Sequence, residues 1–321
     1  MSTEQGVVLE GTGGVWKVRT EAGETRDASL RGRLKQESVE VLKLAVGDRV
    51  VLETDAARTQ WSIAEILPRK SRLARRAPGE GHGERIVAAN VDQVIIVFAA
   101  AKPEPHKRML DRFLVIAEAN SLESRIVINK VELVDRPWVE AYFSDYAVAG
   151  YPVHYTSVKQ AEGLTELHDQ LAGRTSVLTG PSGVGKSSLM NAMYPGLDLR
   201  VGEISESVNK GRHTTVGALL HPLPDAGYVV DTAGLREVGM WGLASEHLDA
   251  CFREFRPFLE QCKFGDCKHE VEPGCAVIGA VGNGISAERY ESYALLRGQI
   301  EEEERKSAAY RVVSKGKKRR S

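Results

Sequence analysis

The sequence predicts a protein of three parts: a small N-terminal β-barrel, a central α/β domain with a parallel sheet, and a helical C-terminal segment. Short β-prone runs fill the first 67 residues, apolar runs alternate with helical stretches from Val91 onwards, and three of the four cysteines lie between positions 262 and 275. We place the boundaries at residues 1–76, 77–241 and 242–321.

Length and composition set the outer limits of the interpretation. The chain has 321 residues, of which 42% are hydrophobic and 27% charged, as in ordinary globular proteins. Its net charge of −1 means that attraction to nucleic acid would come from local basic clusters. Residues 1–6 lack signal-peptide features and no apolar run is long enough to span a bilayer, so we expect a cytoplasmic protein without membrane contact, and a monomer.

The N-terminal part predicts strands at residues 15–18, 38–42 and 49–52, with Gly-containing turns between them. A five-stranded barrel of the OB type fits this length and would close the sheet edges. Trp16 and Trp61 are either core residues or platforms on which bases stack. The basic run 68–76 is either a solvated hinge or a strip that contacts phosphates.

A Gly-rich loop at residues 180–188 follows an apolar run at 176–179 and precedes a helical stretch at 189–193. This order is typical of loops that bind a nucleoside triphosphate, because their N–H groups and the helix N-terminus converge on phosphate oxygens. Lys186 is expected to reach the β- and γ-phosphates and Ser187 to bind Mg²⁺. The predicted phosphate-binding residues are Gly180, Pro181, Ser182, Gly183, Val184, Gly185, Lys186, Ser187 and Ser188.

The central part alternates between predicted strands and helices. Strands are expected at 94–98, 125–128 and 153–155 and helices at 109–119 and 138–143, which indicates a parallel sheet covered on both faces.

Two sequences after these strands are candidates for reading the base. Asn129, Lys130, Val131 and Glu132 resemble the Asn-Lys-x-Asp motif with which GTPases recognise guanine. The carboxylate in that motif accepts two hydrogen bonds that adenine cannot supply. Glu132 is one methylene longer than Asp, so it either still reaches the base or allows an adenine-using or unselective NTPase. Ser157 begins a sequence that resembles the Ser-Ala-Lys loop over the guanine base.

Two further motifs follow the phosphate loop. Residues 211–215 stand where a first switch loop would be, with Thr215, or else Thr214, as ligand of Mg²⁺ and the γ-phosphate. A hairpin then leads to Asp231-Thr232-Ala233-Gly234, where Asp231 is expected to hold Mg²⁺ through water and the Gly234 amide to sense the γ-phosphate.

The base motif precedes the phosphate loop, which is the reverse of the usual order. Such a permutation is physically allowed when the old termini lie close together. We therefore predict a circularly permuted GTPase. Because the second switch, residues 231–241, leads directly into the C-terminal segment, we hypothesise that this connection relays the nucleotide state.

The C-terminal segment contains Cys262, Cys267, His269 and Cys275, a Cys₃His set that predicts one structural Zn²⁺ without an open position. Cys251 is expected to be a core residue in a helical run at 245–255. A Glu-rich helix is expected at 286–309. The basic tail at 315–320 is either solvated or anchored to RNA phosphate.

Together these motifs, Gly-Pro-Ser-Gly-Val-Gly-Lys-Ser, Gly-Arg-His-Thr-Thr, Asp-Thr-Ala-Gly and Cys-x4-Cys-x-His-x5-Cys, resemble the ribosome small-subunit-dependent GTPase A family. Glu132, and Ala233 where the family commonly has Pro, are departures. The resemblance implies GTP hydrolysis stimulated by the small ribosomal subunit and a role late in its assembly. It also implies that the barrel and the zinc segment hold ribosomal RNA.

Catalysis is expected to depend on Lys186, Thr215, Asp231 and Gly234. Leu235 stands where a Ras-like enzyme carries the Gln that orients water, so intrinsic turnover should be slow. His213 is the candidate to orient that water once the subunit orders its loop; alternatively it is a solvated loop residue. An RNA-binding factor in which nucleotide only switches conformation remains the other alternative.

Overall fold

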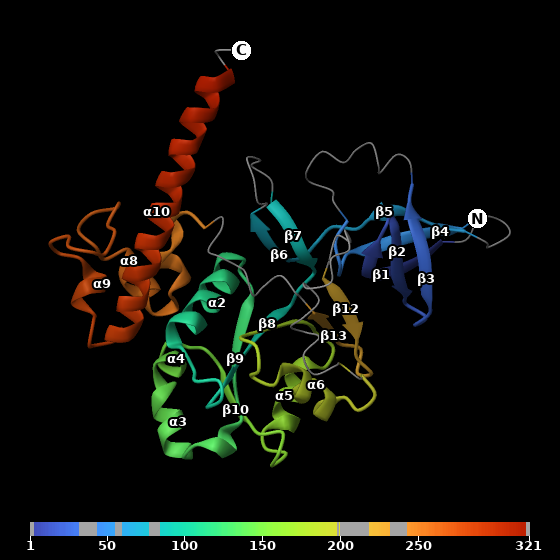
Figure 1. Cartoon of the computed structure of the whole chain (residues 1–321), viewed down its shortest axis with the longest axis horizontal. Coiled ribbons are helices and arrows are strands. Elements are labelled where there is room, and N and C mark those ends of the chain that lie inside the picture. The colour runs from blue at the N-terminus through green and yellow to red at the C-terminus, as the bar shows by residue number, and fades with distance from the viewer. Residues whose placement is uncertain are drawn as a thin grey trace.

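The computed structural model describes residues 3–31, 44–54, 60–76, 84–197, 199, 218–231 and 243–318. The barrel and the C-terminal segment lie on opposite sides of the central α/β domain (Figure 1). This confirms the predicted fold class. The predicted strand at 38–42 and the predicted loops at 211–215 and 232–241 lie outside the described residues, as do the side chains of the basic tail.

The N-terminal strands form a closed barrel in the order β1-β2-β3-β5-β4, with β4 also pairing with β1. All pairs are antiparallel except β3 with β5. Alternating residues such as Val50 and Leu52 point into its core, because successive side chains of a strand face opposite ways. Trp16 and Trp61 are half-buried and pack against that core. The strands are β1 (Thr3–Thr12), β2 (Val15–Thr20), β3 (Thr25–Leu30), β4 (Arg49–Thr54) and β5 (Trp61–Ile66).

The basic run after the barrel is partly a strand. β6 (Arg72–Arg76) pairs antiparallel with β7 (Glu84–Ala89). Just before it, Arg69 donates to both carboxylate oxygens of the fully buried Asp48, at 2.6 and 2.7 Å. This bidentate pair fixes the run to a turn of the barrel, so Arg69 does not belong to a solvated hinge.

The central sheet has six strands in the order β10-β9-β8-β11-β13-β12. All neighbours are parallel except the edge strand β12, which forms the predicted hairpin with β13. Every residue of β8 is buried, as expected for a strand covered on both faces. The strands are β8 (Gln93–Ala99), β9 (Glu123–Asn129), β10 (Val153–Thr156), β11 (Thr175–Thr179), β12 (Leu219–Pro222) and β13 (Tyr228–Asp231).

Helices cover both faces of this sheet, as predicted. One face packs against α2 (Lys107–Ala119), α3 (Arg136–Tyr142) and α4 (Ser144–Val148). The other face packs against α5 (Leu164–Leu171) and α6 (Lys186–Met193).

The C-terminal segment is built from short turns around one long helix, α10 (Ala287–Lys318). The predicted helical run at 245–255 is wrong: it consists of three 3₁₀ turns, η2 (Ser245–His247), η3 (Asp249–Cys251) and η4 (Arg253–Phe255), with Phe252 extended between the last two. Buried Leu248, Phe252 and Phe255 have helical spacing, but a chain of turns presents them to the core equally well. Cys251 is buried, as predicted.

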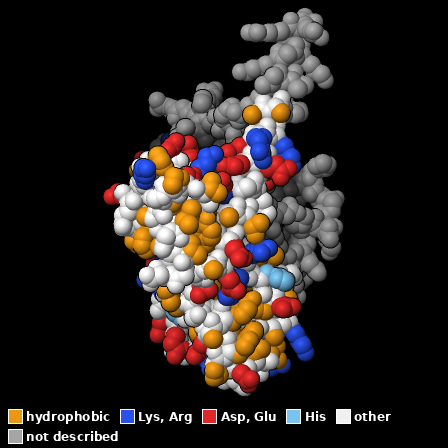
Figure 2. All heavy atoms as spheres, turned by 90° about the vertical axis from the view of Figure 1, so that its left-hand side faces the viewer, with side chains coloured by type: hydrophobic (Ala, Val, Ile, Leu, Met, Phe, Trp, Pro, Cys, Tyr) orange, Lys and Arg blue, Asp and Glu red, His pale blue; other side chains and the backbone are white. Residues whose placement is uncertain are grey.

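Two further short helices complete this segment, α8 (Arg256–Leu259) and α9 (Ala276–Gly279). On this side of the molecule hydrophobic side chains gather in small groups over the C-terminal segment and over α3 and α4, with acidic and basic side chains between them (Figure 2).

A buried ionic cluster joins the C-terminal segment to the central domain. Arg289 of α10 donates to Asp111 of α2 at 2.5 Å and to Glu254 at 2.6 Å, and all three side chains are at most 5% exposed. Tyr146 of α4 donates its hydroxyl to Asp111 at 2.9 Å, and Arg289 lies over the ring of Phe252. The cluster therefore fixes α10 against the helices that cover one face of the sheet.

Candidate functional site

The Gly-rich loop leaves β11 at Thr179 and enters α6 at Lys186, as the sequence predicts. Its glycines are required by close packing and by backbone conformation. Gly180 has φ 133° and a Cβ there would overlap the carbonyl oxygen of Val97; Gly185 has φ 97° and a Cβ would overlap Nδ2 of Asn129. The loop is thus pressed against β8 and the base motif, at the end of β11.

The two polar residues that begin α6 are almost buried. Lys186 is 6% exposed and donates from Nζ to the carbonyl oxygens of Gly180 and Pro181, at 2.8 and 2.7 Å. Ser187 follows it and is 7% exposed. The ammonium group therefore lies inside the loop that the phosphates would occupy, and the helix N-terminus adds partial positive charge.

Asn129 and Lys130 connect the base motif to the phosphate loop. Asn129 ends β9, donates from Nδ2 to Val184 O at 2.9 Å and accepts the hydroxyl of Thr156 at 3.2 Å. Lys130 donates from Nζ to Gly183 O at 2.6 Å and to Lys102 O at 2.5 Å. Burial lowers the pKa of Lys130, and the neighbouring Glu132 opposes that shift.

Glu132 lies in a 3₁₀ turn, η1 (Val131–Leu133), directly after these two residues, and Val131 is buried. The Oε2 atom of Glu132 is buried and has no hydrogen-bond partner among the described residues. A buried carboxylate oxygen is costly without a donor, so Oε2 is available to accept hydrogen bonds from a ligand.

The predicted third loop is a tight turn. Ser157 is fully buried, its backbone pairs with that of Glu162, and its Oγ accepts the N–H of Gln160 at 3.1 Å. Thr156, which directly precedes it, supports Asn129. This contact joins β10 to β9, which are separated by two helices in the chain, so motif spacing does not point to it.

Asp231 ends β13, which lies beside β11 in the sheet. Its partner across the parallel pair is Leu178, one residue before the end of β11, so Asp231 stands at the same sheet edge as the phosphate loop. The predicted residues His213, Thr215 and Gly234 lie outside the described residues.

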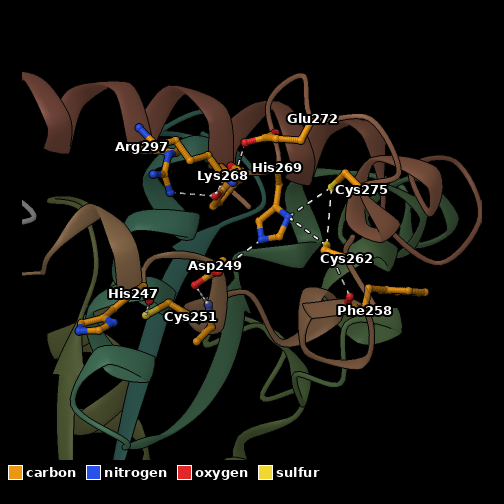
Figure 3. A network of polar contacts seen from close by, with 12 residues as sticks. His247, Asp249, Cys251, Phe258, Cys262, Lys268, His269, Glu272, Cys275 and Arg297 are labelled. Atoms are coloured by element: carbon orange, nitrogen blue, oxygen red, sulfur yellow. Dashed lines mark hydrogen bonds and ion pairs between the residues drawn. The ribbon is translucent and has the colours of Figure 1, made fainter. Parts of the chain in front are cut away.

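The four predicted metal ligands come together. The ligand atoms of Cys262, Cys267, His269 and Cys275 all lie within 4.8 Å of one another. Nδ1 of His269 is 3.3 Å from Sγ of Cys275 and 3.6 Å from Sγ of Cys262, and the two sulfurs are 3.9 Å apart (Figure 3). With metal–sulfur distances of about 2.3 Å and metal–nitrogen distances of about 2.0 Å, tetrahedral coordination requires separations of this size.

Protonation states in the cluster are tightly linked. Burial raises the pKa of Cys275, but the N–H of Ile278, His269 and the neighbouring thiols outweigh it and lower that pKa. Burial lowers the pKa of His269, but Asp249 and the cysteines raise it to about 9. Metal binding releases protons from such a group, because the coordinating forms are the thiolate and the neutral imidazole.

The backbone around His269 is held by α10. Tyr290 donates its hydroxyl to His269 O at 2.7 Å, and Tyr293 donates to Lys268 O at 2.8 Å. On the other side of the ring, Nε2 of His269 lies 3.3 Å from Oδ2 of Asp249. Motif spacing does not point to Asp249, which lies well before Cys262, the first cysteine of the cluster.

A phosphate loop after a central parallel strand, an Asn-Lys pair that braces it and a carboxylate beside them define a P-loop GTPase, and the strand order makes it a circularly permuted one. The chain belongs to the RsgA GTPase family, whose sequence model matches residues 66–241. The protein is a GTP-hydrolysing enzyme.

Relatives match over nearly the whole chain. A protein of Gemmatimonas aurantiaca named small ribosomal subunit biogenesis GTPase RsgA is 61% identical over 297 residues, covering 92% of this chain and 97% of the relative. A protein of the same name from Caldanaerobacter subterraneus subsp. tengcongensis is 39% identical, over 95% and 99% of the two chains.

Two solved structures share the fold. YjeQ from Thermotoga maritima superimposes with a TM-score of 0.76 at 35% identity, covering 93% of this chain and 99% of that one. YloQ, described as a circularly permuted GTPase, gives a TM-score of 0.75 at 29% identity, covering 94% and 96%.

Among the described residues, none of the helices has the length and apolar character needed to cross a membrane.

Proposed function

We propose that this protein is a cytoplasmic GTPase that acts late in the maturation of the small ribosomal subunit, and that the subunit stimulates its hydrolysis of GTP. The names of the relatives support the partner. The observation that carries the choice of nucleotide is the buried Oε2 of Glu132, which has no partner in the described part of the chain and follows an Asn-Lys pair that braces the phosphate loop. The N1–H and N2–H groups of guanine are the donors that such an oxygen lacks.

The proposed roles follow from these positions. The loop 180–188 holds the phosphates, with Lys186 on the β- and γ-phosphates. Ser187, Thr215 and Asp231 supply oxygen ligands to Mg²⁺, directly or through water, which suits the preference of that ion. Bound Mg²⁺ would neutralise charge on the phosphate oxygens. Asn129, Lys130, Val131, Glu132 and Ser157 form the base pocket.

Hydrolysis transfers the γ-phosphoryl group to water, breaking the bond to the β-phosphate oxygen and releasing GDP and phosphate. Gly234 is proposed to contact the γ-phosphate through its amide, and His213 to orient the attacking water when the subunit orders the loop. Slow turnover without the subunit follows, because Leu235 replaces the Gln that orients water in Ras-like enzymes.

We assign the Cys₃His cluster to one structural Zn²⁺, because three thiolates and one imidazole at these separations match its preferred ligand set. The barrel, residues 1–76, and the zinc segment, residues 242–321, are proposed to hold ribosomal RNA on either side of the GTPase domain, residues 77–241, with the protein acting as a monomer.

The test is hydrolysis of GTP and of ATP by the purified protein, each with and without small ribosomal subunits. We expect GTP turnover to rise at least tenfold with subunits and ATP turnover to stay at background. Equal use of ATP would refute guanine selection by Glu132, and indifference to subunits would refute the proposed partner.

Two variants in the same assay separate binding from turnover. Lys186→Ala should abolish triphosphate binding, because it removes the ammonium that donates to the carbonyl oxygens of Gly180 and Pro181 inside the loop. His213→Ala should retain nucleotide affinity and lose the stimulated turnover. Unchanged stimulated turnover in His213→Ala would show that His213 does not take part in catalysis.

A further inference from the structure

His269 presents its two ring nitrogens to two different elements (Figure 3). Nδ1 faces the sulfurs of Cys275 and Cys262, at 3.3 and 3.6 Å, whereas Nε2 faces Oδ2 of Asp249 at 3.3 Å. A metal-bound imidazole is neutral, so one nitrogen gives its lone pair to the metal and the other carries the proton. The geometry assigns the proton to Nε2 and the metal to Nδ1.

The ring of His269 has little freedom to do otherwise. The side chain is 2% exposed, and the backbone has φ 58°, a left-handed conformation that side-chain-bearing residues seldom adopt. Two tyrosine hydroxyls from α10 hold the carbonyl oxygens of His269 and Lys268. Because these contacts fix the backbone, the hydrogen bond to Asp249 determines how the ring is rotated about the Cβ–Cγ bond.

Asp249 is itself well supported. It begins η3, its Oδ1 accepts the N–H of Ala250 at 2.7 Å, and the flanking Leu248 and Phe252 are fully buried in the core of the C-terminal segment. The side chain is 22% exposed, so its carboxylate is only partly screened by solvent.

We propose that Asp249 is a positioning residue of the metal cluster: its carboxylate accepts the Nε2–H of His269, fixes Nδ1 as the ligand atom, and ties the chain that follows residue 242 to the metal. This inference rests on the proposed zinc site. It goes beyond the four ligands, because metal binding would then also stabilise the 3₁₀ turns that lie between the second switch, residues 231–241, and Cys262. Carboxylates that hold a metal-bound histidine this way typically change metal affinity 10–100-fold when removed.

The experiment measures Zn²⁺ affinity of the full-length protein by competition with a chromophoric chelator, for the wild type, Asp249→Ala, Asp249→Asn and Glu246→Gln. We expect about 10–100-fold weaker binding for Asp249→Ala. Asp249→Asn should lose less, because its amide oxygen still accepts the Nε2–H. Glu246→Gln is the matched control, since Glu246 lies in the preceding turn with its side chain 77% exposed.

Two further measurements distinguish positioning from a merely structural role. Amides 245–252 should exchange hydrogen more slowly in the zinc-loaded than in the zinc-free wild type, and this difference should disappear in Asp249→Ala. The visible spectrum of the Co²⁺-substituted protein should change in Asp249→Ala and remain unchanged in Glu246→Gln.

The outcomes that overturn the inference are separable from failure of the zinc site itself. Wild-type affinity in Asp249→Ala, with zinc bound to the wild type, removes Asp249 and leaves the zinc assignment intact. If Asp249→Ala destabilises the protein equally with and without zinc, Asp249 is likewise not a positioning residue, and the zinc assignment again stands. A wild type that binds no zinc overturns both proposals.

Discussion

The phosphate loop and the cysteine-histidine cluster are both short motifs, but the protein holds them in opposite ways. In the phosphate loop, protein atoms already bond the functional groups: Lys186 donates to two carbonyl oxygens of its own loop, and Asn129 and Lys130 brace the loop from β9. In the cluster, the Sγ and Nδ1 atoms lie mainly against one another, and the ligands lie on short turns that α10 holds only at Lys268 and His269 among the contacts described above.

The two sites differ in whether they keep their geometry without a bound ligand. The loop follows a strand at the centre of a six-stranded sheet, so its geometry is determined by a large core and should persist without nucleotide. Among the described residues the cluster has no sheet beneath it, and a metal site rarely stays formed without its ion, so we expect its geometry to depend on the bound cation. Ligand therefore adds function in one region and stability in the other.

Removing the metal should have the largest effect. Metal binding contributes about 10–16 kcal/mol in zinc-finger peptides, so a chelator should release most of the order around residues 262–275. We expect rapid hydrogen exchange and proteolytic cleavage in that region, with GDP affinity unchanged. Equal protection with and without chelator would show that the cluster, like the phosphate loop, stands without its ligand.

The chain supplies a matched pair of cysteine substitutions for this test. Cys275→Ala should reproduce the effect of the chelator. Cys251→Ala removes a buried thiol from the same segment but outside the cluster, and burial raises the pKa of that thiol to about 12, so it stays protonated. It should leave metal binding intact.

A second prediction concerns the junction between the two regions. Arg289→Met removes the guanidinium from between Asp111 and Glu254 and leaves two buried carboxylates without it, which should cost about 3–5 kcal/mol. Denaturant unfolding followed by hydrogen exchange should show the loss in α10 and α2 together. A loss confined to α10 would mean that the C-terminal segment unfolds independently of the GTPase domain.

Lys306→Met provides the control on the same helix. Lys306 pairs only with Glu302 one turn away among the described residues, and its side chain is 72% exposed. Such surface pairs contribute little, so stability should not change measurably.

Much of the central domain was predictable because its strands are buried on both faces. The run at 94–98 is continuously apolar, the run at 125–128 is apolar after Arg125, and the Gly-rich loop lies where a strand gives way to a helix. The barrel was harder. β3, with the sequence TRDASL, has a single buried residue, Ala28, so it carries no strong strand pattern and was missed. The run at 245–255 was misjudged because its buried residues have helical spacing without forming a helix.

The same contrast applies to the sites. Site residues that lie close in sequence, such as the metal ligands from Cys262 to Cys275 or the base motif from Asn129 to Glu132, are visible as motifs. Contacts between distant parts of the chain are not: Asp249 reaches His269 of the cluster across 20 positions, and at the junction of the domains Arg289 reaches Asp111 across 178. These contacts depend on how the turns and helices pack, which local patterns do not encode.

The smallest expected effect tests whether the nucleotide region separates function from stability. Because Oε2 of Glu132 has no partner among the described residues, Glu132→Gln should leave the melting temperature unchanged. It should weaken GDP binding by roughly 10–150-fold, since hydrogen bonds to a charged group contribute about 1.5–3 kcal/mol and the new NH₂ group faces donors of the base. Glu132→Asp keeps the charge and should retain guanine over adenine in competition binding. A Glu132→Gln protein that melts earlier yet binds GDP normally would place this carboxylate in the framework of the domain instead of the base pocket, and the contrast with the metal cluster would no longer hold.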